Sequence, residues 1–448
     1  MKFQEFKELV IARAQAQGLN EYELYYQSSE STAVSVFQHE INEFSSDVSG
    51  GVCFRAIVNG RMGYAATENL SAESAVAIVD TAMENASVLE SDEPVFLGEG
   101  GQVYQTIDRP VPQLPATDLL IAKTLECQEA LYAADPIVTD GTSTQTVRAQ
   151  TQIAICNSKG LDLSCTGATI ALIPMVVIND GKEMADSYGI HAGDLEKMDL
   201  ANIASKTVNK AMQKLGGDIA PTTVCPVVFS TNAMADLLAT FSPVFSSENA
   251  QKGLSRLQGK EGEVIASAAV TLVDDPFYAL STMPMAFDAE GSPTYKKNVI
   301  QEGKLQTLLY NLKTANLAGK STTGNGSKGS YASSVAVRPF TMYLAPGQFT
   351  EEELLEKAGN GVYINALDGL HAGANEVSGD FSLQSAGFLI ENGKKTKAVK
   401  SFTVAGNFFQ LLERITAVAN NLEVPNPLGV TSFGSPSVLV EDLSIAGK

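Results

Sequence analysis

Residues 52–60 read Val-Cys-Phe-Arg-Ala-Ile-Val-Asn-Gly, and this stretch determines the first part of the fold. Its first seven residues are rich in β-branched and aromatic side chains, which is typical of a strand. Asn59 and Gly60 then favour the positive φ angles of a type I′ turn. The stretch therefore predicts a β-hairpin.

The residues on either side of this hairpin complete a larger unit. Upstream, residues 22–27 and 33–38 are strand-like, and an amphipathic helix precedes them, with Phe3, Phe6, Val10 and Ala14 at helical spacing. Downstream, Ser71 is a suitable N-cap for a helix that runs to about residue 86. Residues 1–89 are thus predicted to form a helix, a β-meander and a second helix.

The middle of the chain repeats this order. A helix is predicted over residues 117–134, strands over 146–156 and 161–178, and the turn Asn179-Asp180-Gly181 takes the place of Asn59-Gly60. The closing helix carries one apolar stripe, formed by Leu200, Ile203, Ala204, Val208, Ala211, Met212 and Leu215. Residues 116–218 are therefore interpreted as a duplicate of the first module.

The third region, residues 222–448, mixes strands and helices. A strand is predicted over 224–229, hairpins around 301–304 and Asn392-Gly393, and a capping box at Thr350 and Glu353. A last helix is predicted before a strand at 437–440. Its apolar face would comprise Phe408, Leu411, Leu412, Ile415, Val418 and Ala419. Antiparallel hairpins separated by helices indicate an α+β fold with a larger, mixed and mostly antiparallel C-terminal domain.

Charge and composition exclude several classes of protein. Lys plus Arg total 31 and Asp plus Glu total 51, so the formal net charge is −20. Non-specific affinity for nucleic acid comes from Lys and Arg, so no direct nucleic-acid partner is expected. The longest apolar stretch, residues 168–178, is well short of the ~20 residues that span a bilayer, and the N-terminus lacks a signal-peptide core. Five cysteines without CxxC spacing fit a reducing compartment. We expect a cytoplasmic protein with no membrane partner.

Few side chains in the sequence suit catalysis. The histidines are His39, His191 and His371, whereas a zinc peptidase needs two imidazoles close together on one helix with a glutamate beside them. Glu43 and Phe44 occupy both positions where a second ligand would follow His39. The Gly-x-Ser-x-Gly elbow is absent. A catalytic triad on another scaffold stays open, because triads are defined by geometry.

Two other motifs have a functional and a structural interpretation. Asp288 and Glu290 would share one face if their segment is extended, and paired carboxylates can do acid–base work or hold a cation; the alternative is an acidic strand end. Residues 319–322, Gly-Lys-Ser-Thr, end like a phosphate-binding loop, but Thr314 stands where that motif needs glycine. The polar loop after it, residues 323–326, is either a ligand-presenting loop or a plain connector.

Several phrases along the chain carry a family resemblance. They occur at residues 63–69 (Gly-Tyr-Ala-Ala-Thr-Glu-Asn), 287–291 (Phe-Asp-Ala-Glu-Gly), 321–325 (Ser-Thr-Thr-Gly-Asn), 379–382 (Gly-Asp-Phe-Ser), 387–393 (Gly-Phe-Leu-Ile-Glu-Asn-Gly) and 434–437 (Gly-Ser-Pro-Ser). In this order they resemble the TldD/TldE (PmbA) family, also labelled modulator of DNA gyrase. The resemblance covers nearly the whole chain.

This resemblance implies a pair of related subunits. TldD-type chains hold zinc on a His-Glu-x-x-x-His helix and hydrolyse peptides, whereas TldE-type chains lack that motif. Here the three motif positions fall on Ala239, Thr240 and Val244, and no cysteine follows Cys225, although TldD-type chains supply a cysteine ligand near their end. The chain is therefore TldE-like, with no expected metal ligand and no expected catalytic residue of its own.

Two functions follow as hypotheses. The first is a non-catalytic subunit that works beside a TldD-like zinc subunit and helps to form a cleft for unfolded peptide, with Asp288, Glu290, Asn325 and Asp380 as candidate cleft residues. The second is a stand-alone regulatory or binding protein that acts on a gyrase-linked toxin–antitoxin system. A homodimer in the absence of the partner is a further expectation.

Overall fold

The computed structural model describes residues 1–91 and 93–448. Its N-terminal half contains two units that each begin and end with a helix, and the second unit has an additional short strand and a 3-10 turn. The first unit consists of α1 (Phe3–Ala16), β1 (Glu21–Phe37), β2 (Glu40–Val58), β3 (Arg61–Thr67) and α2 (Ala72–Val88). The second consists of α3 (Thr117–Ala134), β4 (Ser143–Asn157), β5 (Asp162–Asn179), β6 (Met184–Tyr188), β7 (His191–Ala192), a 3-10 turn (Leu195–Lys197) and α4 (Leu200–Met212).

The two units share a single antiparallel sheet. Its strand order is β3-β2-β1-β4-β5-β6, with β7 also paired to β5. β1 pairs with β4 from Glu23 opposite Asn157 to Phe37 opposite Ser143. The two short strands predicted at 22–27 and 33–38 are therefore one strand, because β4 gives hydrogen-bond partners to the polar residues between them.

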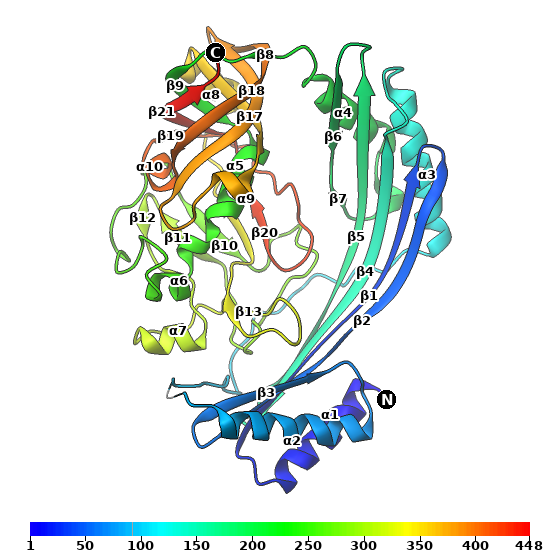
Figure 1. The fold of residues 1–448 in the computed structure, drawn as a ribbon, viewed down its shortest axis with the longest axis vertical. Helices are drawn as coiled ribbons and strands as arrows, with labels where there is room; N and C mark the ends of the chain where they lie inside the picture. Colours follow the sequence, from blue (N-terminus) through cyan, green and yellow to red (C-terminus); the bar gives the residue numbers. More distant parts are fainter. Residues whose placement is uncertain (92) are drawn as a thin grey trace.

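Helices cover one face of this sheet and the C-terminal domain covers part of the other. In Figure 1, α1 and α2 lie at one end of the long strands and α3 lies at the opposite end. Leu24, Val52 and Phe54 are buried under α1 and α2, while Val34 and Leu172 are buried under α3 and α4. On the opposite face, Tyr25 and Ile155 pack against C-terminal residues that include Met283, Met285 and Phe287.

The C-terminal domain is built around two sheets. The smaller has the order β12-β11-β10-β15-β20 and the larger β19-β21-β9-β16-β17-β18-β8, and β13 pairs with β14 separately. Its strands are β8 (Asp218–Ile219), β9 (Thr223–Phe229), β10 (Leu272–Asp275), β11 (Lys297–Gln301), β12 (Lys304–Leu305), β13 (Gly326–Ser327), β14 (Ala336–Val337), β15 (Thr341–Leu344), β16 (Gly361–Asp368), β17 (Asp380–Glu391), β18 (Lys394–Asn407), β19 (Ile415–Val418), β20 (Ser432–Gly434) and β21 (Val438–Ala446). Its helices are α5 (Thr231–Phe241), a 3-10 turn (Ser242–Phe245), α6 (Ser247–Gln251), α7 (Leu312–Leu317), α8 (Glu351–Ala358), α9 (Leu370–Gly373) and α10 (Phe408–Glu413). The predicted α+β class, with mostly antiparallel sheets, is confirmed.

Local turn and cap signals act as predicted. Asn59 and Gly60 have φ angles of 51° and 78°, as a type I′ turn requires. The Ser71 side chain accepts a hydrogen bond from the Ser74 amide at 3.1 Å and begins α2. The capping box of Thr350 and Glu353 is formed at the start of α8.

The helix predicted over residues 408–419 is wrong in its second half. α10 ends at Glu413, and Ile415 and Val418 lie in β19, opposite Val440 and Val438 of β21. Apolar residues three and four apart satisfy a helix, but a short buried strand can carry the same residues. Pairing with a distant strand decides between the two.

No helix in the described residues, 1–91 and 93–448, is both long enough and apolar enough to cross a bilayer.

Candidate functional site

The metal-motif positions lie at the end of α5. This helix begins at Ser230, whose hydroxyl accepts a hydrogen bond from the Ala233 amide at 3.2 Å. Ala239 and Thr240 are half-buried in its last turn, and Val244 is buried in the 3-10 turn that follows. The Thr240 hydroxyl donates to the Asp236 carbonyl at 2.9 Å, within its own helix.

These side chains do not fit a zinc site. Zinc in proteins takes imidazole, thiolate or carboxylate ligands, whereas Ala239 and Val244 offer only methyl groups and Thr240 a hydroxyl. Asp236 is the single carboxylate of α5. Among the described residues, no group of three or more His, Cys, Asp or Glu side chains is placed to hold a metal ion. Positions 239, 240 and 244 therefore supply no side chain that fits a zinc ligand.

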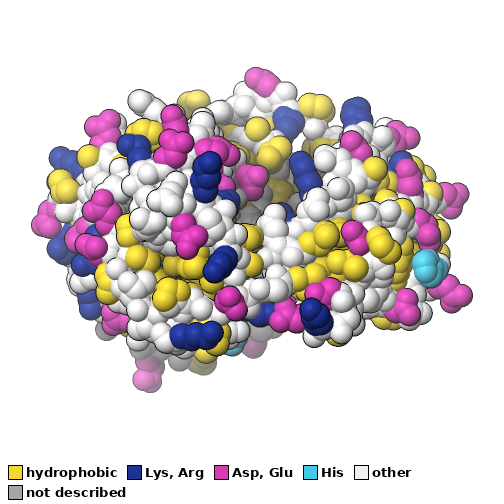
Figure 2. Space-filling model, turned by 90° about the horizontal axis from the view of Figure 1, so that it is seen from above, with side chains coloured by type: hydrophobic (Ala, Val, Ile, Leu, Met, Phe, Trp, Pro, Cys, Tyr) yellow, Lys and Arg dark blue, Asp and Glu magenta, His cyan; other side chains and the backbone are white. Residues whose placement is uncertain are grey.

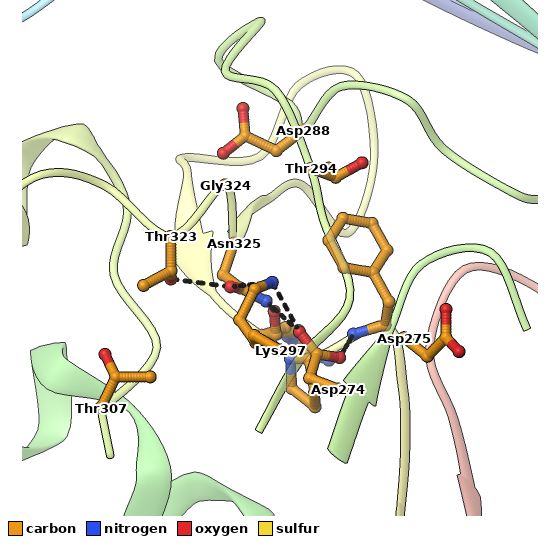
Figure 3. Close-up of polar contacts among 12 residues, drawn as sticks. Asp274, Asp275, Asp288, Thr294, Lys297, Thr307, Thr323, Gly324 and Asn325 are labelled. Atoms are coloured by element: carbon orange, nitrogen blue, oxygen red, sulfur yellow. Dashed lines mark hydrogen bonds and ion pairs between the residues drawn. The ribbon is translucent and has the colours of Figure 1, made fainter. Parts of the chain in front are cut away.

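Asn325 is the centre of a buried polar network (Figure 3). Its side-chain amide donates to Asp274 Oδ2 at 2.8 Å and to the Arg338 carbonyl at 3.0 Å. Its oxygen accepts from Lys297 Nζ at 3.1 Å and from Thr323 Oγ1 at 2.7 Å. Asn325 has no exposed surface, so in this structure it holds the 323–326 loop against β10 and β11.

The same network pairs two buried charges. Lys297 Nζ lies 3.2 Å from Asp274 Oδ2, and the two side chains are 4% and 0% exposed. Asp274 Oδ1 accepts a further hydrogen bond from the Phe340 amide at 2.7 Å. Buried charges are tolerated when they are paired and hydrogen-bonded in this way.

Asp288 and Glu290 lie in a turn and not in an extended strand, so the shared face considered from the sequence does not form. Asp288 Oδ1 accepts from the amides of Glu290 and Ser292, both at 2.9 Å, and its Oδ2 accepts from the Gly326 amide at 2.8 Å. Gly291, with φ of 78°, supplies the left-handed conformation that the turn needs. Asp288 thereby links its own turn to Gly326, the neighbour of Asn325 in the 323–326 loop.

Glu290 faces the N-terminal sheet. Glu23 of β1 lies opposite Arg55 of β2, and Arg55 Nε donates to Glu23 Oε1 at 2.9 Å while Nη2 reaches the same oxygen. Burial, followed by the negative charge of Asp288, raises the pKa of Glu290, whereas the positive charge of Arg55 lowers it. A cluster of buried ionisable groups, Glu23, Arg55, Asp288 and Glu290, thus lies where the sheet meets the C-terminal domain.

The raised pKa of Glu290 predicts a pH-dependent stability. As pH rises above about 4.5, the unfolded chain releases this proton before the folded chain does, so the group lowers the free energy of unfolding as the pH increases. Glu290→Gln keeps an acceptor for the Leu312 amide and removes the charge. We expect the stability of Glu290→Gln relative to the wild type to increase from pH 5 to pH 8 in denaturant titrations. A constant difference across that range would contradict the assignment.

Asp380 lies away from the other three candidate residues. It is exposed at the start of β17, and its carboxylate accepts from Asn407 Nδ2 at 2.8 Å, which lowers its pKa. A small cavity of about 310 Å³ nearby is lined by Gly253, Ser255, Arg256, Asn375, Val377 and Ser378. The structure therefore brings together Asp288, Glu290 and Asn325, and separates Asp380 from them.

A large cavity lies between the sheet and the C-terminal domain. Its volume is about 840 Å³, and it is lined by the linker (residues 107–116), by β5, by residues 192–196 and by the loop 279–284. Arg109 ties the linker to that loop by donating to the Ser281 carbonyl at 2.8 Å. Seen from above, the surface of the molecule is hollowed between its two halves (Figure 2). None of the four candidate cleft residues lines this cavity.

One wall of the cavity is a free strand edge. β7 pairs with β5 at Ala171 and Leu172, and the Gly193 amide donates to the Ile170 carbonyl at 3.0 Å. Backbone groups alternate in direction along an antiparallel strand. Ala168, Thr166 and Ser164 therefore direct their amide and carbonyl groups to the same side of β5 as the Ile170 carbonyl. In the described part of the chain, no strand pairs with this side of β5 before Ala171.

Models of known protein families match the chain along most of its length. Residues 222–447 match the model of the PmbA/TldA metallopeptidase C-terminal domain, residues 22–86 that of domain 1 and residues 110–215 that of the central domain. The chain belongs to the PmbA/TldD metallopeptidase family. Its α+β fold is that of this family.

Individual members of the PmbA/TldD family are similar over almost the full chain. A Thermotoga maritima protein described as a modulator of a DNA gyrase is 29% identical, with a TM-score of 0.89, 99% of this chain and 100% of that chain covered. TldE from Thermococcus kodakarensis is 25% identical, with a TM-score of 0.88 and 98% and 99% covered. The TldD metalloprotease homologue of Haemophilus influenzae is 25% identical, over 95% of this chain and 92% of its own.

Sequence reasoning missed several residues that organise the site of this family member. Lys297, Asp274, Glu23 and Arg55 were not singled out. Arg55 carried a usable signal, since it is the one charge in the apolar run 52–58, and a charge in such a run needs a buried partner. Asp274 and Lys297 lie 23 residues apart with no local pattern between them, so only the folded chain reveals that they pair.

Proposed function

We propose that this chain is a non-catalytic subunit of a zinc metallopeptidase complex that acts on unfolded peptides. The observation that carries the proposal is the end of α5, where Ala239, Thr240 and Val244 provide no ligand for a metal and no base. A family member with this helix needs a second chain to supply the chemistry. The likeness to TldE of Thermococcus kodakarensis supports the same role.

The cavity beside β5 supports a part in holding the peptide. An extended peptide can add to an exposed strand edge, gaining affinity from backbone hydrogen bonds with little dependence on its sequence. The edge at Ser164, Thr166 and Ala168 faces a cavity of about 840 Å³, which matches the volume of ordinary ligand sites. We assign the peptide to this edge, in place of the buried residues Asp288, Glu290 and Asn325.

We also propose that the subunit works in the cytoplasm. All five cysteines, Cys53, Cys127, Cys156, Cys165 and Cys225, are free, which suits a reducing compartment. The net charge of −20 supports a protein or peptide partner over nucleic acid.

Reconstitution tests the proposal. The isolated chain is expected to bind no stoichiometric zinc and to cleave no unfolded peptide. Addition of a family member that carries His-Glu-x-x-x-His, from the same genome, should give peptidase activity that a chelator removes. Zinc-dependent cleavage by this chain alone would overturn the proposal. Rebuilding the motif by Ala239→His, Thr240→Glu and Val244→His is not a useful control, because Val244 is 1% exposed and the chain is not packed for an imidazole there.

The alternative function is a stand-alone regulatory or binding protein. It is favoured by the relative described as a modulator of a DNA gyrase. Purification of the native complex separates the two proposals. A gyrase or toxin–antitoxin component bound in the absence of a zinc-motif chain supports the alternative.

A further inference from the structure

The outer edge of β2 is bare along most of its length. β3 pairs with β2 only from Val52 to Val58. The preceding residues, Glu40 to Gly51, pair with β1 on one side, and no strand of the described chain pairs with them on the other. A strand of this kind presents a row of free backbone donors and acceptors, every second residue directing its pair outward.

The sheet face beside this edge is also uncovered. α3 contacts β1, β4 and β5, and α2 contacts β2 and β3 at the opposite end of the sheet. Three large apolar side chains on this face of β2 are exposed: Ile41 (45%), Phe44 (51%) and Val48 (81%). Farther along β2, Val52, Phe54 and Ala56 are completely buried, because β3 and α2 cover that half. The bare half lacks both a neighbouring strand and a covering helix.

The usual protection against edge pairing is largely missing. Proteins guard free edges with charged side chains, above all Lys, with Pro or with bulges. Residues 14–54 contain no Lys, Arg or Pro, and the single bulge lies near the hairpin end, at Ser35 and Val36. A bare edge of this length that is guarded only by carboxylates is open to a strand from another chain.

The charge of this edge indicates which kind of chain can pair with it. The edge carries Glu40, Glu43 and Asp47 and no cation. Two copies paired edge to edge would bring three carboxylates from each chain together, and like charges across neighbouring strands are destabilising. A strand with Lys or Arg would instead be attracted and brought into register.

We propose that the outer edge of β2, residues 40–51, is the docking surface for a different chain, which adds a strand bearing Lys or Arg and covers Phe44 and Val48 with apolar side chains. This inference rests on the proposed function, whose partner chain it places on the molecule. The added strand extends the sheet beyond β2, on the side opposite β5 and the cavity.

The test uses full-length chains and the zinc-motif family member from the same genome as the probe. Val48→Asp places a charge among the apolar side chains and is expected to weaken the complex about tenfold or more. Glu43→Lys with Asp47→Lys should also weaken it, and this loss should shrink at high salt. Val264→Asp is the matched control, because Val264 is equally exposed (76%) on the C-terminal domain. Hydrogen exchange of residues 40–51 should slow in the complex.

Each outcome decides the inference. A complex of unchanged affinity and peptidase activity with Val48→Asp, and unprotected amides at 40–51, overturns the docking surface and leaves the proposed function standing. A wild-type chain that pairs through this edge only with itself overturns the choice of occupant. Failure of the wild-type chain to bind the zinc-motif member refutes the proposed function, and the inference with it. Circular dichroism and thermal unfolding of the free variants confirm that each one is folded.

Discussion

Arg55→Met is expected to lower the free energy of unfolding by about 3–5 kcal/mol, the usual loss when one partner of a buried ion pair is removed. Arg55 and Glu23 have side chains that are 4% and 1% exposed. Without the guanidinium, Glu23 remains in the sheet as a buried carboxylate, and the described chain offers it no other ion pair. One of its oxygens, Oε2, already has no hydrogen-bond partner.

Denaturant titration at pH 7 measures this loss, and two further variants identify its cause. Glu23→Gln combined with Arg55→Met should recover part of the stability, because the unpaired charge is gone. Arg13→Met is the matched control. Arg13 also makes two bonds to one carboxylate, that of Asp80, but the pair is solvent-accessible, and we expect a much smaller loss. Equal losses at Arg13 and Arg55 would contradict the role of burial.

The parts of the fold that follow from local chemistry were predictable. Asn59-Gly60, Asn392-Gly393, Ser71 and Thr350 each satisfy a backbone requirement of their own turn or helix end, and the structure has all four as predicted. The length of β2 was not predictable. Residues 40–50 are polar or exposed on both faces, so they show no alternation, and they form a strand because β1 pairs with them.

The site was less predictable than the fold. The positions Ala239, Thr240 and Val244 could be found from the family resemblance, because the motif spacing is local. Asp288 and Asn325 were singled out as cleft residues, and their burial shows that they organise loops. Besides local contacts, Asp288 meets the Gly326 amide and Asn325 meets Asp274 across long separations, and no sequence period reports such contacts. Peptide contact by Asp380, which is exposed, stays a prediction.

Lys297→Met is the second substitution with a large expected effect. It leaves Asp274 charged and buried beside Asn325, with hydrogen bonds from the Asn325 and Phe340 amide groups but no cation. We expect a loss of about 3–5 kcal/mol in the free energy of unfolding. Because Lys297 also bonds to Asn325 Oδ1, the 323–326 loop should become susceptible to proteolysis at lower denaturant concentration than in the wild type.

The neighbouring residue supplies the control for this prediction. Lys296 also pairs with an aspartate, Asp275, but its side chain is 56% exposed. Lys296→Met removes an equal charge one position away. Its partner Asp275 is only 9% exposed but keeps hydrogen bonds from the Phe277 amide and the Tyr343 hydroxyl, so we expect a smaller loss than for Lys297→Met. Asp274→Asn together with Lys297→Met should be more stable than Lys297→Met alone, since an amide does not carry the unpaired charge. If Lys296→Met and Lys297→Met lose the same stability, the buried network is not what holds the Asn325 loop in place.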